Sequence, residues 1–152
     1  FDGRIAEDFK LATGTFVSVG PLRGKIIAAG APYIQDVVLT GINLKEVGAM
    51  VFPTAAVRQL SGLPADASMH DVLDAPPVLA QFQKLVDELA RNATGSANRI
   101  ARPCLLADPP TIDRGEITDK GSINQRAVLS HRADTVAKLH SDGLRYILKP
   151  NA

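Results

Sequence analysis

The feature that most constrains the fold is an apolar periodicity in the middle of the chain. Six apolar side chains recur there at intervals of three and four residues, the spacing that places side chains on one face of an α-helix. They are Val78, Leu79, Phe82, Leu85, Val86 and Leu89. We predict a core-packing helix here, with Asp74 as its cap, the prolines that follow in its first turn, and its end at residues 92–95.

Short strands are expected to give this helix something to pack against. Alternating or continuous apolar residues between glycine-rich and proline-rich turns are typical of strands. We expect strands over residues 9–13, 16–19, 34–41, 47–52 and 100–107. A turn at residues 43–45 would join the third and fourth strands as a hairpin, a short helix is expected over residues 22–29, and the turn-rich residues 61–77 are interpreted as an insertion or connecting loop. The element order predicts a compact α+β domain in which helices cover a small mixed sheet.

The last helix is expected to open at Ser122 and to run to about Ser141. Gln125 stands three residues after Ser122. This is the Ser-x-x-Gln capping box, in which two side chains satisfy backbone N–H groups at a helix start.

Composition excludes several classes of protein. The chain has 152 residues and a net charge of +1, from 17 lysines and arginines against 16 aspartates and glutamates. That balance lacks the basic excess of a nucleic-acid-binding domain, and no apolar run reaches the roughly 18 residues of a membrane span. The length fits one domain. We therefore expect a globular domain that binds neither nucleic acid nor membrane.

The residues that most often bind metals or act as nucleophiles are few. Cys104 is the single cysteine, so an internal disulfide and a multi-thiolate metal site are excluded, and a reducing compartment such as the cytoplasm is expected. Cysteine is often buried and inert, which is our expectation for Cys104. His131 and His140, nine residues apart on one predicted helix, would point about 180° apart. With His70 in the turn-rich segment, we expect all three histidines to be solvated and no metal site to form.

Two segments of the sequence were compared with phosphate-binding motifs, and one of them, around Lys120, leaves two interpretations open. Residues 20–26 differ from a P-loop because three residues instead of four separate the glycines, and Ile26 stands where a magnesium-binding hydroxyl is needed. Lys120 lies just before the predicted last helix, whose unpaired N–H groups favour an anion. From local chemistry alone, Lys120 is either part of an anion site or an exposed loop lysine.

Three segments resemble one enzyme superfamily. Residues 3–14, Gly-Arg-Ile-Ala-Glu-Asp-Phe-Lys-Leu-Ala-Thr-Gly, resemble the segment that opens the C-terminal domain of adenylate-forming enzymes, which include acyl-CoA synthetases, luciferases and peptide-synthetase adenylation domains. Residues 115–126, Gly-Glu-Ile-Thr-Asp-Lys-Gly-Ser-Ile-Asn-Gln-Arg, are similar to the closing lysine motif of these enzymes, and residues 34–41 resemble their central strand. The residues of both end motifs most resemble those of bacterial feruloyl-CoA synthetases. The resemblance covers the chain from residue 1 to about residue 140.

The resemblance implies a reaction in two halves. An acid attacks ATP to give an acyl-adenylate and pyrophosphate, and coenzyme A then displaces AMP to give a thioester. The chain would be the mobile C-terminal domain, with residues 1–14 next to the hinge. A large N-terminal domain, absent here, would hold the acid and ATP with magnesium. The first residue, Phe1, is not an initiator methionine, so we expect a fragment, inactive alone, of an enzyme for an aromatic acid such as ferulate.

The resemblance also implies site residues. Arg4 would hydrogen-bond the ribose hydroxyls, since its five fixed donors suit a polyhydroxyl face. Lys120 would reach the carboxylate and the α-phosphate during adenylation. Lys10 and Gly14 would lie on the face used with coenzyme A, with glycine allowing close backbone approach.

This chain departs from the family pattern at two places. The hinge position, usually Asp or Lys, is Ala6, followed by Glu7. The closing lysine usually follows the glycine, whereas here Lys120 precedes Gly121 and Ser122 follows it. A second hypothesis therefore stays open, a non-catalytic α+β ligand-binding or interaction domain in which Lys120 is solvated and Arg4 is a surface residue.

Overall fold

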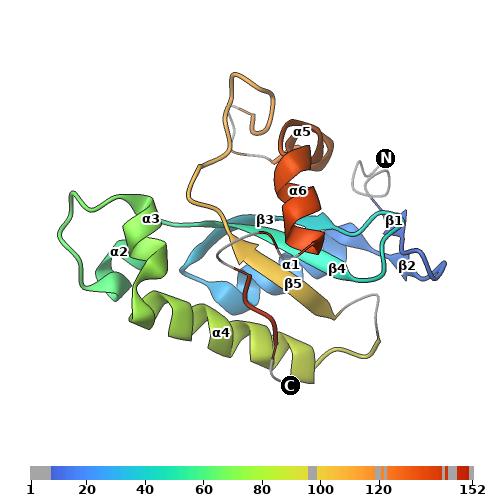
Figure 1. Ribbon diagram of the computed structural model, residues 1–152, viewed down its shortest axis with the longest axis horizontal. Coiled ribbons are helices and arrows are strands. Elements are labelled where there is room, and N and C mark those ends of the chain that lie inside the picture. Colours follow the sequence, from blue (N-terminus) through green and yellow to red (C-terminus); the bar gives the residue numbers. More distant parts are fainter. Residues whose placement is uncertain are drawn as a thin grey trace.

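The computed structural model describes residues 8–95, 99–118, 121, 123–141, 143 and 147–150. Its helices and strands follow one another in a mixed order (Figure 1). They are β1 (Phe9–Lys10), β2 (Phe16–Val17), α1 (Val19–Gly30), β3 (Ile34–Thr40), β4 (Val47–Pro53), α2 (Ala56–Ser61), α3 (Met69–Asp74), α4 (Pro76–Arg91), β5 (Ile100–Leu105), α5 (Gln125–His131) and α6 (Ala133–His140). The predicted α+β class is confirmed.

A three-stranded mixed sheet forms the centre, in the order β3-β4-β5. β3 and β4 are antiparallel, with Val38 opposite Met50, whereas β4 and β5 are parallel, with Met50 opposite Cys104. β4 is the central strand and is buried on both faces, which explains its continuous apolar sequence. β1 and β2 form a separate antiparallel pair.

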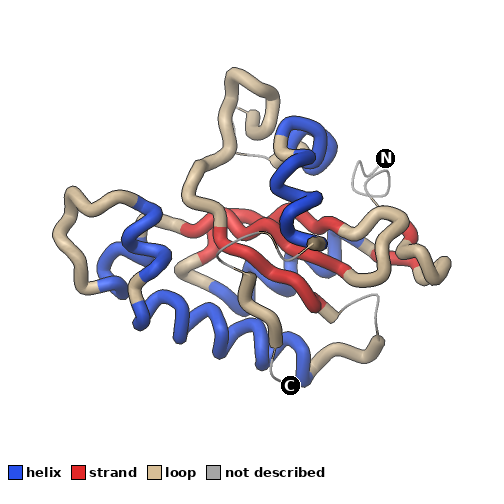
Figure 2. Tube along the Cα trace, in the orientation of Figure 1, coloured by secondary structure: helices blue, strands red, loops and turns tan. Residues whose placement is uncertain are grey.

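The two faces of the sheet carry separate cores because successive side chains of a strand point to opposite sides. Val37, Leu39 and Val51 pack with residues of α1 and α4 on one face. Val38 and Met50 pack with residues of α5 and α6 on the other. Figure 1 and Figure 2 show α4 along one side of the sheet and α5 and α6 on the opposite side.

Helix α4 confirms the predicted amphipathic helix, whereas its predicted cap is wrong. Val78, Phe82 and Leu85 on its apolar face are buried. Asp74, however, is the last residue of α3, and α4 begins at Pro76 after Ala75 without a side-chain cap. Prolines in the first turn lack N–H groups that would otherwise need a partner, so this helix start depends less on a capping side chain.

The turn-rich segment 61–77 is not a plain connecting loop. α2 precedes it and ends at Ser61, and α3 lies inside it, with Val72 and Leu73 fully buried. The side chain of Ser68 caps α3 by accepting a hydrogen bond from Asp71 N at 3.1 Å. Each helix has only six residues, too few for a helical period to emerge from the sequence.

The predicted single last helix is two helices, and the first of them begins at Gln125 instead of Ser122. α5 and α6 meet at Arg132, whose φ and ψ of −113° and 32° are not helical. Asn124 caps α5 by accepting a hydrogen bond from Ala127 N at 3.2 Å. Gln125 instead reaches β3, where its Oε1 accepts from Leu39 N at 3.1 Å and its Nε2 donates to Val37 O at 2.9 Å. Ser122 lies outside the described residues.

Among the described residues, no helix has both the length and the apolar character needed to cross a membrane.

Candidate functional site

The structure describes two of the site residues expected from the sequence, Lys10 and Gly14. Arg4, Ala6, Glu7 and Lys120 lie outside the described residues. The chain therefore gives direct geometry for the expected coenzyme A face, and for the residues that flank Lys120.

Lys10 and Gly14 belong to one small hairpin. Lys10 is exposed on β1 opposite Phe16 of β2. Gly14 has a φ of +86° in the connecting turn, and a Cβ at that position would meet nothing within 4 Å. Glycine adopts this conformation without strain and leaves the backbone accessible. The hairpin thus presents a lysine charge and an open stretch of backbone.

One buried side chain and several hydrogen bonds join the base of the hairpin to the rest of the domain. Leu11 is 2% exposed and packs into the larger core. Asp8 Oδ1 accepts a hydrogen bond from Val19 N at 2.8 Å, which joins the start of β1 to the start of α1. Asn43 N donates to Lys10 O at 2.9 Å and Ala12 N donates to Leu44 O at 2.7 Å. The exposed tip therefore projects from a well-anchored base.

Around Lys120, the chain on both sides is closely bonded. Gly121 N donates to Thr118 O at 2.9 Å, and Ile117 and Ile123 form an antiparallel bridge. Asn124 N donates to Glu116 O at 2.9 Å. The segment that contains Lys120 therefore leaves and returns to the domain at neighbouring points, directly before α5.

Glu116, directly before the segment 117–123 that contains Lys120, has a buried carboxylate that accepts four hydrogen bonds. Its side chain is 1% exposed. It accepts from Arg132 Nε at 2.8 Å and Nη2 at 3.1 Å, and from Thr111 N at 3.0 Å and Oγ1 at 3.2 Å. The hydrogen bonds from Arg132 lower the pKa of Glu116 to about 2, against the opposing effect of burial. Sequence reasoning missed both residues, although Glu116 lies inside the quoted closing motif.

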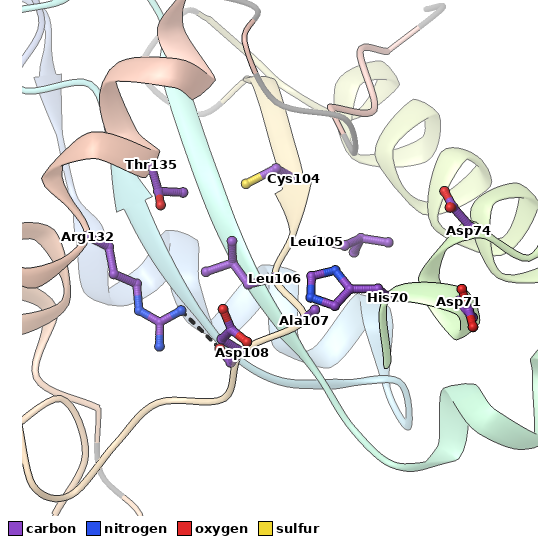
Figure 3. Close-up of a pocket in the computed structure, with 10 residues that line it drawn as sticks. All are labelled: His70, Asp71, Asp74, Cys104, Leu105, Leu106, Ala107, Asp108, Arg132 and Thr135. Carbon is purple, nitrogen blue, oxygen red and sulfur yellow. Dashed lines mark hydrogen bonds between the residues drawn. The ribbon is translucent and has the colours of Figure 1, made fainter. Parts of the chain in front are cut away.

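A cavity of about 440 Å³ lies beside the end of β5, between α3 and α6. Figure 3 shows His70, Asp71 and Asp74 on one side, Arg132 and Thr135 on the other, and Cys104 between them at the top of the view. Arg132 donates through Nη1 to Asp108 O at 2.9 Å. Of the predicted site residues that the structure describes, neither Lys10 nor Gly14 lines this cavity.

The nucleophile and histidine predictions have mixed outcomes. Cys104 is buried as expected, and burial raises its pKa to about 12, which keeps the thiol protonated and unreactive. His70 and His131 are exposed. His140 is half-buried instead of fully solvated: its Nε2 lies 2.7 Å from Thr40 Oγ1, and burial, reinforced by the nearby charge of Arg102, lowers its pKa. Within the described part of the chain, no three metal-binding side chains come together.

Three of the solved structures with the same fold come from Segniliparus rugosus and Mycobacterium chelonae. The A-PCP didomain of carboxylic acid reductase from Segniliparus rugosus, in complex with AMP, is 23% identical with a TM-score of 0.59, over 89% of this chain and 17% of that chain. The A domain of that enzyme, in complex with AMP and a co-purified carboxylic acid, is 22% identical with a TM-score of 0.60, over 91% of this chain and 20% of that chain. The adenylation domain of a carboxylate reductase from Mycobacterium chelonae is 21% identical with a TM-score of 0.64, over 91% of this chain and 20% of that chain. The chain thus spans about a fifth of each of these proteins.

A search of curated proteins gave no match. The family model of the AMP-binding enzyme C-terminal domain matches residues 8–143, from the start of the β1–β2 hairpin to just beyond α6. This match covers most of the chain, and the fold agrees with it. The chain belongs to the family of C-terminal domains of AMP-binding, adenylate-forming enzymes.

Proposed function

We propose that this chain is the C-terminal domain of a larger acyl-CoA synthetase, which converts an acid, ATP and coenzyme A into acyl-CoA, AMP and pyrophosphate. The observation that carries the proposal is the family match over residues 8–143. That range contains both the β1–β2 hairpin and the segment of the closing motif. The rest of the enzyme, an N-terminal partner domain, would supply the pockets for the acid and for ATP with magnesium.

In the adenylation half-reaction, Lys120 is the proposed catalytic residue. Its positive charge would stabilise the negative charge that develops on the α-phosphate, the kind of electrostatic contribution that dominates such transfers. The described residues on either side of it, Thr118 and Gly121, are joined by a hydrogen bond of 2.9 Å from Gly121 N to Thr118 O. Arg4 would bind the ribose hydroxyls of the nucleotide.

In the thioester half-reaction, the β1–β2 hairpin is the proposed surface for coenzyme A. The exposed ammonium of Lys10 suits a phosphate group, and the open backbone at Gly14 suits the close passage of a pantetheine arm. A turn of the domain about Ala6 or Glu7, which immediately precede the hairpin in the chain, would exchange the two surfaces at the reacting centre.

The acid is proposed to be aromatic, such as ferulate. The support is the resemblance of residues 3–14 and 115–126 to bacterial feruloyl-CoA synthetases. The acyl pocket would belong to the partner domain, so this proposal is tested on the complete enzyme with a panel of aromatic and aliphatic acids.

Separating the two half-reactions tests the proposal. In the complete enzyme, Lys120→Ala is expected to slow acid-dependent ATP–pyrophosphate exchange about 10²–10³-fold, as removal of one charge-stabilising group commonly does. Thioester formation from a supplied acyl-adenylate should survive. Lys10→Ala should show the opposite pattern, and Lys25→Ala, an exposed lysine on α1, is the matched control.

Three results would count against the proposal. Equal effects of Lys120→Ala on both half-reactions would remove its specific role. A fully active Lys10→Ala enzyme would remove the hairpin from the coenzyme A surface. Acyl-adenylate formation without any thioester product would leave adenylation standing and contradict the synthetase assignment.

A further inference from the structure

The ion pair between Glu116 and Arg132 occupies a junction of three parts of the domain. Arg132 lies between α5 and α6, with its guanidinium carbon 5.1 Å from the centre of the Phe52 ring on β4. Its Nη1 and Nη2 groups donate to Asp108 O and Pro109 O, both at 2.9 Å. Its remaining bonds go to the Glu116 carboxylate. One arginine thus joins the sheet, the helix junction and the loop that follows β5.

Glu116 holds the loop through its main chain as well as its side chain. Its N–H donates to Thr111 O at 3.0 Å, and its C=O accepts from Asn124 N at 2.9 Å. Asn124 is the cap of α5, so the two ends of the segment 117–123 are joined at Glu116. The side chain fixes this base to Arg132, and Lys120 lies within the segment in sequence.

A buried ion pair is a costly way to hold a loop. Moving charges out of water carries a penalty that the mutual attraction offsets only when the geometry is favourable, and apolar replacements are often equally stable. The fork of Arg132 on both carboxylate oxygens does, however, fix orientation more tightly than apolar packing, because both planes are set by two parallel N–H···O bonds. The pair is therefore better suited to precision than to stability.

We infer that Glu116 and Arg132 are positioning residues for adenylation, which fix the base of the loop that carries Lys120. This inference rests on the proposed role of Lys120. Glu116 and Arg132 are placed to act through the loop, with Glu116 enclosed by Thr111 and Arg132. A misplacement of about 1 Å at a reacting group can cost on the order of 10²-fold in rate.

The test is a set of variants of the complete enzyme, assayed in each half-reaction. Glu116→Gln keeps the shape but removes the charge, and Arg132→Lys keeps the charge but removes the fork. Glu116→Gln is expected to lower the kcat of adenylation by about 10²-fold. Arg132→Lys is expected to lower it by less. The KM for ATP and the thioester half-reaction should change by no more than about twofold, because binding contacts and the second surface are untouched.

Coupling to Lys120 distinguishes positioning from a general effect on folding. If Glu116 acts through the lysine, Glu116→Gln added to Lys120→Ala should cause no further loss of adenylation. Asp36→Asn is the matched control, since Asp36 and Arg23 form a second carboxylate–guanidinium fork at 2.8 Å, between β3 and α1. It should lower the thermal midpoint as Glu116→Gln does and leave adenylation unchanged.

Several outcomes would overturn the inference. If Lys120→Ala slows adenylation but Glu116→Gln does not, the pair is not a positioning device, while the proposed function stands. Multiplicative losses in the double variant, or an equal loss in Asp36→Asn, would likewise contradict it. If Lys120→Ala itself has no effect, the proposed function fails and the inference fails with it.

Discussion

Glu116 is a carboxylate that the fold keeps ionised in spite of almost complete burial. The fork from Arg132 and the two hydrogen bonds from Thr111 lower its pKa to about 2, from an ordinary value of 4.5. Because the folded-state pKa lies below the unfolded-state pKa, the stabilisation is present in full above about pH 4.5 and declines as the pH falls toward about 2. A shift of this size corresponds to on the order of 3 kcal/mol.

We therefore predict a pH-dependent difference between the chain and its Glu116→Gln variant. The free energy of unfolding, measured by denaturant titration, should favour the unchanged chain at neutral pH, and the difference should shrink between about pH 4.5 and pH 2. Glu88→Gln, on the exposed face of α4, serves as the control and should leave the profile unchanged. A difference that stayed constant over that range would show that the carboxylate charge does not stabilise the fold.

At the scale of elements, Gln125 completes the edge of the sheet. β3 is an edge strand, and its outward Val37 C=O and Leu39 N–H would have no strand partner. The amide of Gln125 supplies one acceptor and one donor in the places a neighbouring strand would. It also joins the first turn of α5 to the sheet.

Gln125→Leu should therefore destabilise the domain more than its volume change suggests. The variant leaves a buried N–H and a buried C=O unpaired, each costing about 1–3 kcal/mol. Gln59→Leu, at an exposed position of α2, should change stability by no more than about 0.5 kcal/mol. Thermal or chemical denaturation of both variants decides the matter, and equal midpoints would mean that water satisfies the β3 edge without Gln125.

Elements with a strong local signal were predictable from the sequence, and those held by distant contacts were not. The periodicity of residues 78–89 identified α4, and the apolar runs identified β3 and β4. α2 and α3 were missed because their helical form depends on burying Val57 and Val72 in the core. The start of the last helix was misplaced because Asn124 caps α5 and the amide of Gln125 forms its bonds with β3, many residues away along the chain.

The candidate site followed the same division. The resemblance of residues 3–14 pointed to Lys10 and Gly14, and the structure places them on one hairpin. Glu116 and Arg132 had no signal of their own, since a glutamate and an arginine sixteen residues apart are ordinary surface residues until a fold buries them. The role of Lys120 remains a prediction.

At the scale of the whole molecule, this domain is proposed to supply positioned charges and a mobile surface to a partner domain. Its described residues form a buried base in the sheet and α4, and its expected contacts lie on the β1–β2 hairpin and in the loop before α5. Catalysis by positioning and charge requires that the substrates be held elsewhere. The domain should consequently be necessary for the reaction and insufficient for it.

Acid-dependent ATP–pyrophosphate exchange tests this claim most directly. It would be measured for the complete enzyme, for the same enzyme shortened so that it ends at residue 7 of this chain and lacks the domain, and for the chain alone. We predict exchange by the complete enzyme, a loss of about 10²-fold or more in the shortened enzyme, and none by the chain alone, because the groups that stabilise the developing charge are then separated from the bound substrates. Exchange by the isolated chain, or full exchange by the shortened enzyme, would contradict the account.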